Sequence, residues 1–293
     1  MGAPANPSRS PAKSTPQRSV AHRFAGACGK RLADVMVLGV RCDDDELKDL
    51  QPRAQPYWGE TLVLRLRPGR LEPASALAGA ARCIACCGRD VVVVDDRSAL
   101  RGLDGALLLE GVLDLFDDRA NARVLALRDD GAVTDVVTGA QLLRVPGGRA
   151  IRGGVIVTPD AIVGLDGATL HEGCVDVACA GAPGRLAWSR GRNLVVDGRA
   201  FMLAQPAHAL CFGFGKLFVG SQVNGLSVVD DDGLRSLRPS LRAHGLSMLD
   251  DGLLVVCDLM VATSDDGVDF VSRDLAAYVR LAAHHSDKHA QHA

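Results

Sequence analysis

Two histidines at matching positions are the first residues of this chain to suggest chemistry. His208 opens the run HALCFGFG and His244 opens the run HGLSMLDDG, and similar short apolar segments follow both. Asp176 opens the corresponding segment of the preceding unit. Imidazole and carboxylate are a common ligand set for divalent transition metals. Asp176, His208 and His244 are therefore candidate ligands for a small molecule or metal, although polar residues that only hydrogen-bond loops fit the same pattern.

A second group, Cys83, Cys86 and Cys87, contains the C-x-x-C spacing that zinc and redox sites use. A zinc site of this type needs a second cysteine pair, and no such pair follows. Residues three apart in a strand point to opposite faces. We therefore expect these cysteines to pack in a core.

Four of the eight histidines lie near the C-terminal end, at positions 284, 285, 289 and 292. His285 and His289 have the i, i+4 spacing that can hold a metal on a helix. A dedicated site needs three or four fixed ligands with supporting contacts, so a solvated tail is favoured and no cofactor is assigned. The sequence leaves metal binding open.

The candidate ligands belong to repeated units of short strands. Between residues 207 and 275, two units each contain four apolar runs separated by Gly, Asn-Gly or Asp-Gly, as in strands joined by tight hairpins. Such recurring four-stranded units are typical of propeller blades. The expected second strands of five units align at Val92, Ile162, Leu186, Leu217 and Leu254. We predict an all-β, six- or seven-bladed β-propeller in which the unit from 150 to 173 is short for four strands.

In a propeller the first strands surround the central channel, so Asp176, His208 and His244 would lie at its rim. The propeller is expected over 34–275, with the strand that begins at Asp34 closing the ring by pairing with the last blade. Residues 1–33 are basic and contain no acidic residue, which favours a disordered tail, with a transit peptide or a nucleic-acid-contacting arm as alternatives. A short C-terminal helix and the His-rich tail are expected over 276–293.

One hairpin carries a family resemblance. In the run TSDDGVDF, Thr263, Asp265, Gly267 and Phe270 stand at the Ser/Thr, Asp, Gly and aromatic positions of an Asp box, and the run resembles the Asp-box hairpin of bacterial-neuraminidase-type repeats. It departs at Asp269, where that family usually has Thr.

The segments KLFVGS and NGLSVVDDDG also resemble the short propeller repeats of two-component-regulator sensor domains. These resemblances imply a fold and not an activity. Sialidase chemistry needs a Tyr nucleophile and arginines that grip a carboxylate, and the two tyrosines of the chain, Tyr57 and Tyr278, are badly placed for it. No catalytic residue is assigned.

Composition narrows the remaining choices. The net charge of −2 offers no field to attract nucleic acid, except through the basic N-terminal tail. No apolar run is long enough to span a membrane, and nine cysteines, several inside apolar runs, favour a reducing, cytoplasmic location. The sequence favours a non-enzymatic scaffold with a protein partner. The alternative is a propeller enzyme or a small-molecule- or metal-binding protein with its site at the central channel.

Overall fold

The computed structural model describes residues 22–32, 35–41, 61–67, 70–77, 81–87, 90–181, 184–257 and 260–274. The elements whose bounds lie within these ranges are strands and one short 3-10 helix, η3 (Arg119–Asn121), and Leu32 also has 3-10 backbone conformation. The chain is therefore all-β, as the sequence predicted. No helix within these ranges is long and apolar enough to cross a membrane.

The strands form seven antiparallel sheets, and each sheet is built from four strands that follow one another in the sequence. Blades 1 and 2 contain β1 (His22–Cys28), β2 (Val35–Arg41), β3 (Thr61–Arg67), β4 (Arg70–Leu77), β5 (Ala81–Cys87), β6 (Asp90–Asp95), β7 (Leu100–Gly102) and β8 (Leu107–Leu109). Blades 3 and 4 contain β9 (Val112–Asp118), β10 (Arg123–Arg128), β11 (Ala132–Asp135), β12 (Gln141–Arg144), β13 (Ala150–Arg152), β14 (Val155–Val157), β15 (Ala161–Gly164) and β16 (Thr169–Glu172).

Blades 5 and 6 contain β17 (Val177–Gly181), β18 (Arg185–Arg190), β19 (Asn193–Val196), β20 (Arg199–Met202), β21 (Ala209–Gly213), β22 (Lys216–Ser221), β23 (Gly225–Asp230) and β24 (Gly233–Arg238). Blade 7 contains β25 (Ala243–Leu249), β26 (Gly252–Cys257), β27 (Met260–Ser264) and β28 (Val271–Asp274). The blade count is seven.

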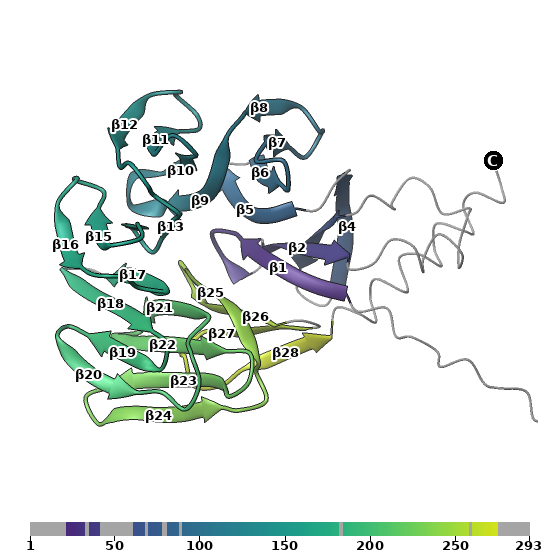
Figure 1. The fold of residues 1–293 in the computed structure, drawn as a ribbon. Helices are drawn as coiled ribbons and strands as arrows, with labels where there is room; N and C mark the ends of the chain where they lie inside the picture. Colours follow the sequence, from purple (N-terminus) through teal and green to yellow (C-terminus); the bar gives the residue numbers. More distant parts are fainter. Residues whose placement is uncertain are drawn as a thin grey trace, which may run out of the picture.

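The seven sheets form a ring, with the first strand of each blade toward the centre and the fourth strand at the outside (Figure 1). Each first strand lies beside the first strand of the next blade, and β25 lies beside β1. The short unit from 150 to 173 does hold four strands, because each is only three or four residues long. Ile162 consequently lies in the third strand of its blade, β15, and its assignment to a second strand was wrong.

The hydrophobic core is divided among the blade interfaces. Each of the seven apolar clusters in the described ranges joins two neighbouring blades. In β2, Val35 and Val37 pack toward blade 7, whereas Met36 and Leu38 pack toward blade 2. Because both faces of a blade are covered, its strands can be apolar at successive positions, as in the run 91–94.

Among the strands that the structure describes, none is exchanged between blades 1 and 7, where the ring closes. The strand expected to pair with the last blade is β2, and it lies between β1 and β3 in the first sheet, so that expectation was wrong. An apolar cluster from β2, β3, β26 and β27 fills the closing interface. Asp250 N donates to Lys30 O at 2.8 Å, and Leu32 N donates to Asp251 Oδ1 at 2.8 Å. The two ends of the ring are thus held by packing and by these hydrogen bonds.

The first strand begins earlier than the expected boundary at residue 34. β1 covers His22–Cys28, inside the range assigned to the basic tail, and pairs with β2 from His22↔Arg41 to Cys28↔Met36. The pairing partner explains why this mixed, basic segment forms a strand. Residues 1–21 and the expected C-terminal helix and His-rich tail over 276–293 lie outside the described residues.

Aspartates shape the hairpins between the third and fourth strands of blades 2 to 7. Their side chains accept hydrogen bonds from backbone N–H groups of the turn or of the neighbouring strand, at Asp104, Asp135, Asp166, Asp197, Asp230 and Asp266. The first four follow one another at equal spacing. Such side-chain to backbone bonds stabilise a turn without further secondary structure.

The hairpin that resembles an Asp box is one of these turns. Ser264 Oγ accepts from Gly267 N at 2.8 Å, and Asp266 Oδ1 accepts from Val268 N at 2.7 Å and Asp269 N at 2.9 Å. The side chains that hold the turn are therefore Ser264 and Asp266, one residue later than the sequence alignment placed them. The resemblance of this run to an Asp box therefore reflects a turn that is held by a serine and an aspartate side chain.

Candidate functional site

The structure aligns two of the three candidate ligands as the sequence predicted. Asp176 N donates to Ser189 O at 2.8 Å, and His208 N donates to Gly220 O at 2.8 Å, so both residues stand directly before the first strand of their blade. Both are exposed. His244 is half-buried in β25, at a bulge between Ala243 and Gly245. A bulge re-aims the side chain of its extra residue.

Each aligned side chain is bonded to a turn of its own blade. Asp176 Oδ2 accepts from Gly191 N at 2.6 Å, in the turn between β18 and β19. His208 Nδ1 accepts from Gln222 N at 3.4 Å, in the turn between β22 and β23. Each contact fixes the loop that joins the second and third strands of its own blade.

Arg82, the bulged residue of β5, has the same role in blade 2. Its Nη2 donates to Ser98 Oγ at 2.8 Å, in the turn between β6 and β7, and to Val112 O at 3.0 Å, at the start of β9. This side chain therefore ties its own blade to the next. Asp176, His208 and Arg82 thus each hydrogen-bond the loop between the second and third strands of their own blade. We call this contact a loop tie.

A metal centre is not assembled by these residues. No three His, Cys, Asp or Glu side chains in the described part of the chain, which includes Asp176, His208 and His244, are grouped so that they could hold one metal ion. The three-ligand arrangement considered from the sequence is thus absent from this rim. Binding of a small molecule by these residues stays a prediction.

Charged pairs further connect the inner strands. Arg152 Nε lies 3.2 Å from Asp114 Oδ2, which links β13 to β9 of the preceding blade. The same carboxylate oxygen accepts from Ile151 N at 3.2 Å. The Asp114 side chain is 7% exposed, so the pair and the backbone bond together satisfy a nearly buried carboxylate.

One arginine crosses the interior of the ring. Arg119 follows β9 in blade 3, and its Nη1 donates to Met248 O in β25 of blade 7. Its Nε also lies 3.1 Å from Asp117 Oδ2. Burial raises the pKa of Asp117 above its ordinary value, although Arg119 opposes that rise. Because blades 3 and 7 are not neighbours, this side chain spans the channel near the ends of the inner strands.

The cysteines of β5 pack to opposite sides, as the sequence predicted. Cys83 packs into the cluster between blades 2 and 3, and Cys86 packs into the cluster between blades 1 and 2. Burial raises the pKa of the Cys83 thiol. Cys86, however, has a neighbour that the sequence did not indicate, because its Sγ lies 2.7 Å from Cys28 Sγ. Cys28 belongs to β1, which lies inside the range 1–33 that was expected to be a tail.

Apolar side chains are also exposed on the outer strands. In blades 2, 3 and 4 the fourth strand has a β-bulge, and the extra residue is Leu108, Leu142 or Leu170. These side chains are 51%, 40% and 45% exposed, respectively. We call the three residues the leucine rim. Repetition of the bulge and the residue type in consecutive blades is a signal that could be found in the sequence only once the blade boundaries were known.

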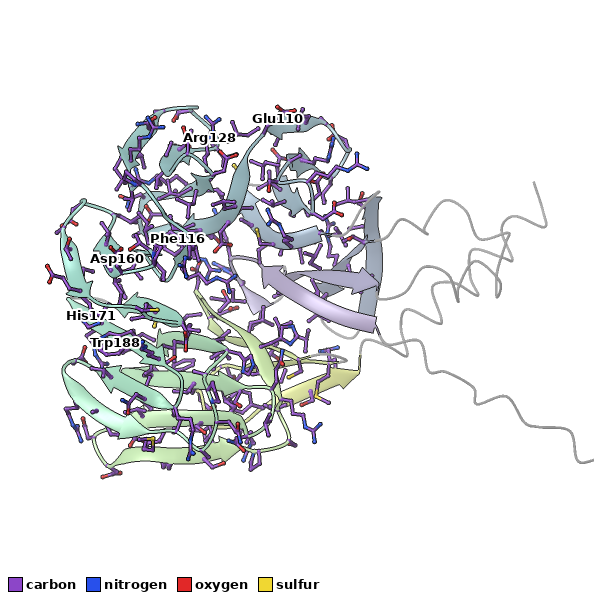
Figure 2. All side chains as sticks on the ribbon, in the orientation of Figure 1. Glu110, Phe116, Arg128, Asp160, His171 and Trp188 are labelled. Carbon is purple, nitrogen blue, oxygen red and sulfur yellow. The ribbon has the colours of Figure 1, made fainter. Side chains whose placement is uncertain are left out.

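The outer strand of blade 4 also touches the next blade. His171 in β16 stacks on Trp188 in β18, with ring centroids 4.2 Å apart and an interplanar angle of 24°. Figure 2 shows the two labelled side chains side by side between their strands. Aromatic contacts of this kind add to the packing between two blades.

Comparison with known proteins supports the fold alone. No protein-family model and no curated protein matches the chain. Among solved structures, the chain is similar to the WD40 β-propeller domain of Doa1, with 9% identity over 87% of this chain and 94% of that one and a TM-score of 0.55. It is also similar to Sqt1 from Saccharomyces cerevisiae, with 12% identity over 86% and 85% of the two chains and a TM-score of 0.54.

A third similar structure is BamB from Moraxella catarrhalis, with 15% identity over 85% of each chain and a TM-score of 0.52. At these identities the likeness concerns the propeller architecture. Because propellers host many unrelated functions, the neighbours do not assign an activity to this chain.

Proposed function

We propose that this protein is a non-enzymatic scaffold that binds an apolar surface of a partner protein through the leucine rim on blades 2 to 4. The observation that carries the proposal is the exposure of Leu108, Leu142 and Leu170 at equivalent bulges of three consecutive blades. Single exposed leucines are common on protein surfaces, but regular repetition along one side of a ring is a more specific feature.

The equivalent leucine of blade 6 supports this interpretation. Leu237 is the extra residue of the bulge in β24, and it packs against the apolar cluster between blades 6 and 7. A leucine at this position can therefore be buried within the propeller. Those of the leucine rim face solvent instead, where a partner protein could cover them.

The bulges also favour one mode of contact. A bulge breaks the regular row of backbone donors and acceptors on an outer strand, and it discourages pairing with a further strand. We infer that the partner packs side chains against the leucine rim and does not extend the blades by β-augmentation.

The channel alternative receives less support from the contacts described above. Asp176 and His208 are both occupied with turns of their own blades. We therefore favour binding over catalysis.

We also propose a cytoplasmic location, which is consistent with the eight described cysteines being free thiols.

The test starts from the intact protein in its own host cells. A photo-crosslinking amino acid placed at Leu142 should capture a partner that the same group at Val223, exposed in blade 6, does not capture. The captured protein is then purified, and its affinity is measured by isothermal titration calorimetry. The triple variant Leu108→Ala/Leu142→Ala/Leu170→Ala should bind about 100-fold more weakly, at about 1 kcal/mol for each lost apolar contact.

The matched control is Met202→Ala/Val223→Ala/Val271→Ala, which removes three apolar side chains that are each more than 60% exposed elsewhere on the molecule. It should bind within about threefold of the wild type. Equal affinity of the leucine-rim variant and the wild type would overturn the proposal. Capture of a second copy of this chain at Leu142 would replace the scaffold with a self-associating propeller.

A further inference from the structure

Two cysteines from neighbouring blades meet near the ends of their inner strands. Cys28 is the last residue of β1 and Cys86 is the next-to-last residue of β5. They are 58 residues apart in the sequence, and their Sγ atoms are 2.7 Å apart. A disulfide bond is about 2.05 Å long, so the sulfurs need to move only a small distance to bond. We propose that Cys28 and Cys86 are a redox pair that reversibly forms a disulfide between blades 1 and 2.

The two thiols differ in the way that such chemistry requires. Cys86 is half-buried and so reachable by a small reagent, whereas Cys28 is 3% exposed. The hydrogen bond with Cys28 lowers the pKa of Cys86 below its ordinary value, although burial and the charge of Asp117 oppose this. The charges of Arg119 and Lys30 act in the same direction as the bond. Cys86 is consequently the better nucleophile at neutral pH, because the thiolate is the reactive form.

Cys28 has the properties of the second, resolving thiol. Burial raises its pKa, and the hydrogen bond and the negative charge of Cys86 raise it further. Once Cys86 has been converted to a mixed disulfide it carries no charge, and that part of the barrier to ionisation of Cys28 is removed. A reactive, accessible cysteine next to a resolving cysteine is the arrangement found in redox-sensing proteins.

The other cysteines of the core provide a contrast. Burial raises the pKa of Cys179, and it raises the pKa of Cys211 to about 11. Burial also raises the pKa of Cys87, the neighbour of Cys86 on the opposite face of β5. These three thiols stay protonated at neutral pH and are expected to react slowly.

The reaction can proceed by exchange with a small disulfide such as glutathione disulfide. The Cys86 thiolate attacks one glutathione sulfur and breaks its S–S bond, forming a mixed disulfide and releasing one glutathione thiolate. Cys28 then loses its proton to solvent and attacks Cys86 Sγ. The second glutathione leaves as a thiolate, and the Cys28–Cys86 bond remains. The two cysteines lose two electrons in total, and one glutathione disulfide gains them to become two glutathione thiols.

The disulfide would join blades 1 and 2, which are otherwise held together by the packing of their apolar side chains. Blade 1 exchanges none of the described strands with blade 7, and it is held to blade 2 through the cluster that contains both cysteines. A covalent link at this place restrains the N-terminal blade in the oxidised state and releases it on reduction.

The experiment measures the pair in the protein without any substitution. Reduced protein is equilibrated with mixtures of glutathione and glutathione disulfide and quenched in acid. It is then unfolded in guanidinium chloride at neutral pH in the presence of excess N-ethylmaleimide, so that the buried thiols are also alkylated. Non-reducing digestion and mass spectrometry then map the linked peptides. Oxidation should lower the number of alkylated cysteines from nine to seven through a Cys28–Cys86 link, and dithiothreitol should restore nine.

Two variants serve as controls. Cys86→Ser should keep Cys28 alkylated at every redox ratio. Cys87→Ser, changed at the adjacent thiol, should still form the Cys28–Cys86 link. The proposal is overturned if both cysteines of the wild type stay alkylated in excess glutathione disulfide, if Cys28 links to another cysteine, or if Cys86 stops at the mixed disulfide.

Discussion

At the scale of single residues, a polar side chain at the start of an inner strand can face a ligand in the channel or fix a nearby loop. Sequence position does not distinguish the two roles, because both place the residue at the same register. Which role a residue has depends on whether the turn between the second and third strands of its blade comes close enough to hydrogen-bond its side chain. Asp176 and His208 both contact such a turn, and Arg82 does the same in blade 2. We therefore expect substitutions at these residues to affect stability.

Replacement of Asp176 tests the loop-tie role. Asp176→Ala removes the acceptor of the Gly191 N–H and should lower the free energy of unfolding by about 1 kcal/mol in urea denaturation. Asp231→Ala changes an exposed aspartate that lies on the surface between β23 and β24, and it should have little effect. A change in ligand affinity or metal content with unchanged stability in Asp176→Ala would contradict the tie and favour a channel site.

Asp95 should contribute to acid sensitivity. Burial opposes ionisation, but hydrogen bonds from Ala99 N, Arg97 N and the Arg101 side chain outweigh it and hold the pKa of Asp95 below its ordinary value. A carboxyl with a lowered folded pKa stabilises the protein above the unfolded pKa of about 4, and this contribution is lost as the pH falls through the folded value.

Asp95→Asn should accordingly flatten the acid side of the stability curve. Urea denaturation between about pH 6 and pH 2.5 should show a smaller loss of unfolding free energy than in the wild type. Asp96→Asn makes the same chemical change at the exposed neighbouring aspartate and serves as the matched control. Parallel curves for Asp95→Asn and the wild type would contradict the assignment.

At the scale of strands and blades, the sequence was informative where turn chemistry is explicit. The turn at Gly225 was predictable because Asn-Gly marks a hairpin turn that needs a positive φ. The structure agrees, since Gly225 has a φ of 75° and an added Cβ would clash with Arg238 O. Blade 4 was harder to recognise because its strands are very short. β1 was missed because no apolar run marks it, and the pairing that makes it a strand involves a segment beyond a turn.

The contacts between blades could not be read from the sequence. Cys28 and Cys86 come together only because blade 2 stacks on blade 1, and Arg119 reaches Met248 only because the ring closes. Repetition shows that blades exist, but it does not show which side chains of two blades meet. For the candidate site, the sequence could predict that its residues lie at the starts of inner strands, but not which groups their side chains contact.

The stack of His171 on Trp188 gives an optical test of one such contact. In a Trp58→Phe background Trp188 is the single tryptophan. His171→Ala should shift its emission to longer wavelength, because the indole gains exposure to water, and should cost about 1 kcal/mol of stability. Glu172→Ala, at the exposed neighbouring residue, should leave both properties unchanged. An unshifted spectrum in His171→Ala would show that the rings do not stack in solution.

At the scale of the whole molecule, one of the seven interfaces differs from the others in its connectivity. Six interfaces join blades that are consecutive in the chain, whereas the interface between blades 1 and 7 joins the two ends of the propeller. Because none of the described strands is exchanged there, either end can separate without breaking one of the seven sheets. Packing at that interface should therefore decide how the ring opens.

Two buried leucines allow this idea to be tested at matched burial. Leu254 lies in the cluster between blades 7 and 1, and Leu217 lies in the cluster between blades 5 and 6, and both are fully buried. Truncation of either leucine to alanine should cost about 2–5 kcal/mol through lost contacts and a cavity. Amide hydrogen exchange should distinguish the two variants, because it shows which region opens first. Leu254→Ala should increase exchange first in β1–β4 and β25–β28, whereas Leu217→Ala, flanked by connected blades on both sides, should raise exchange evenly over the ring. Uniform exchange in Leu254→Ala would mean that the closing interface opens no more readily than the others.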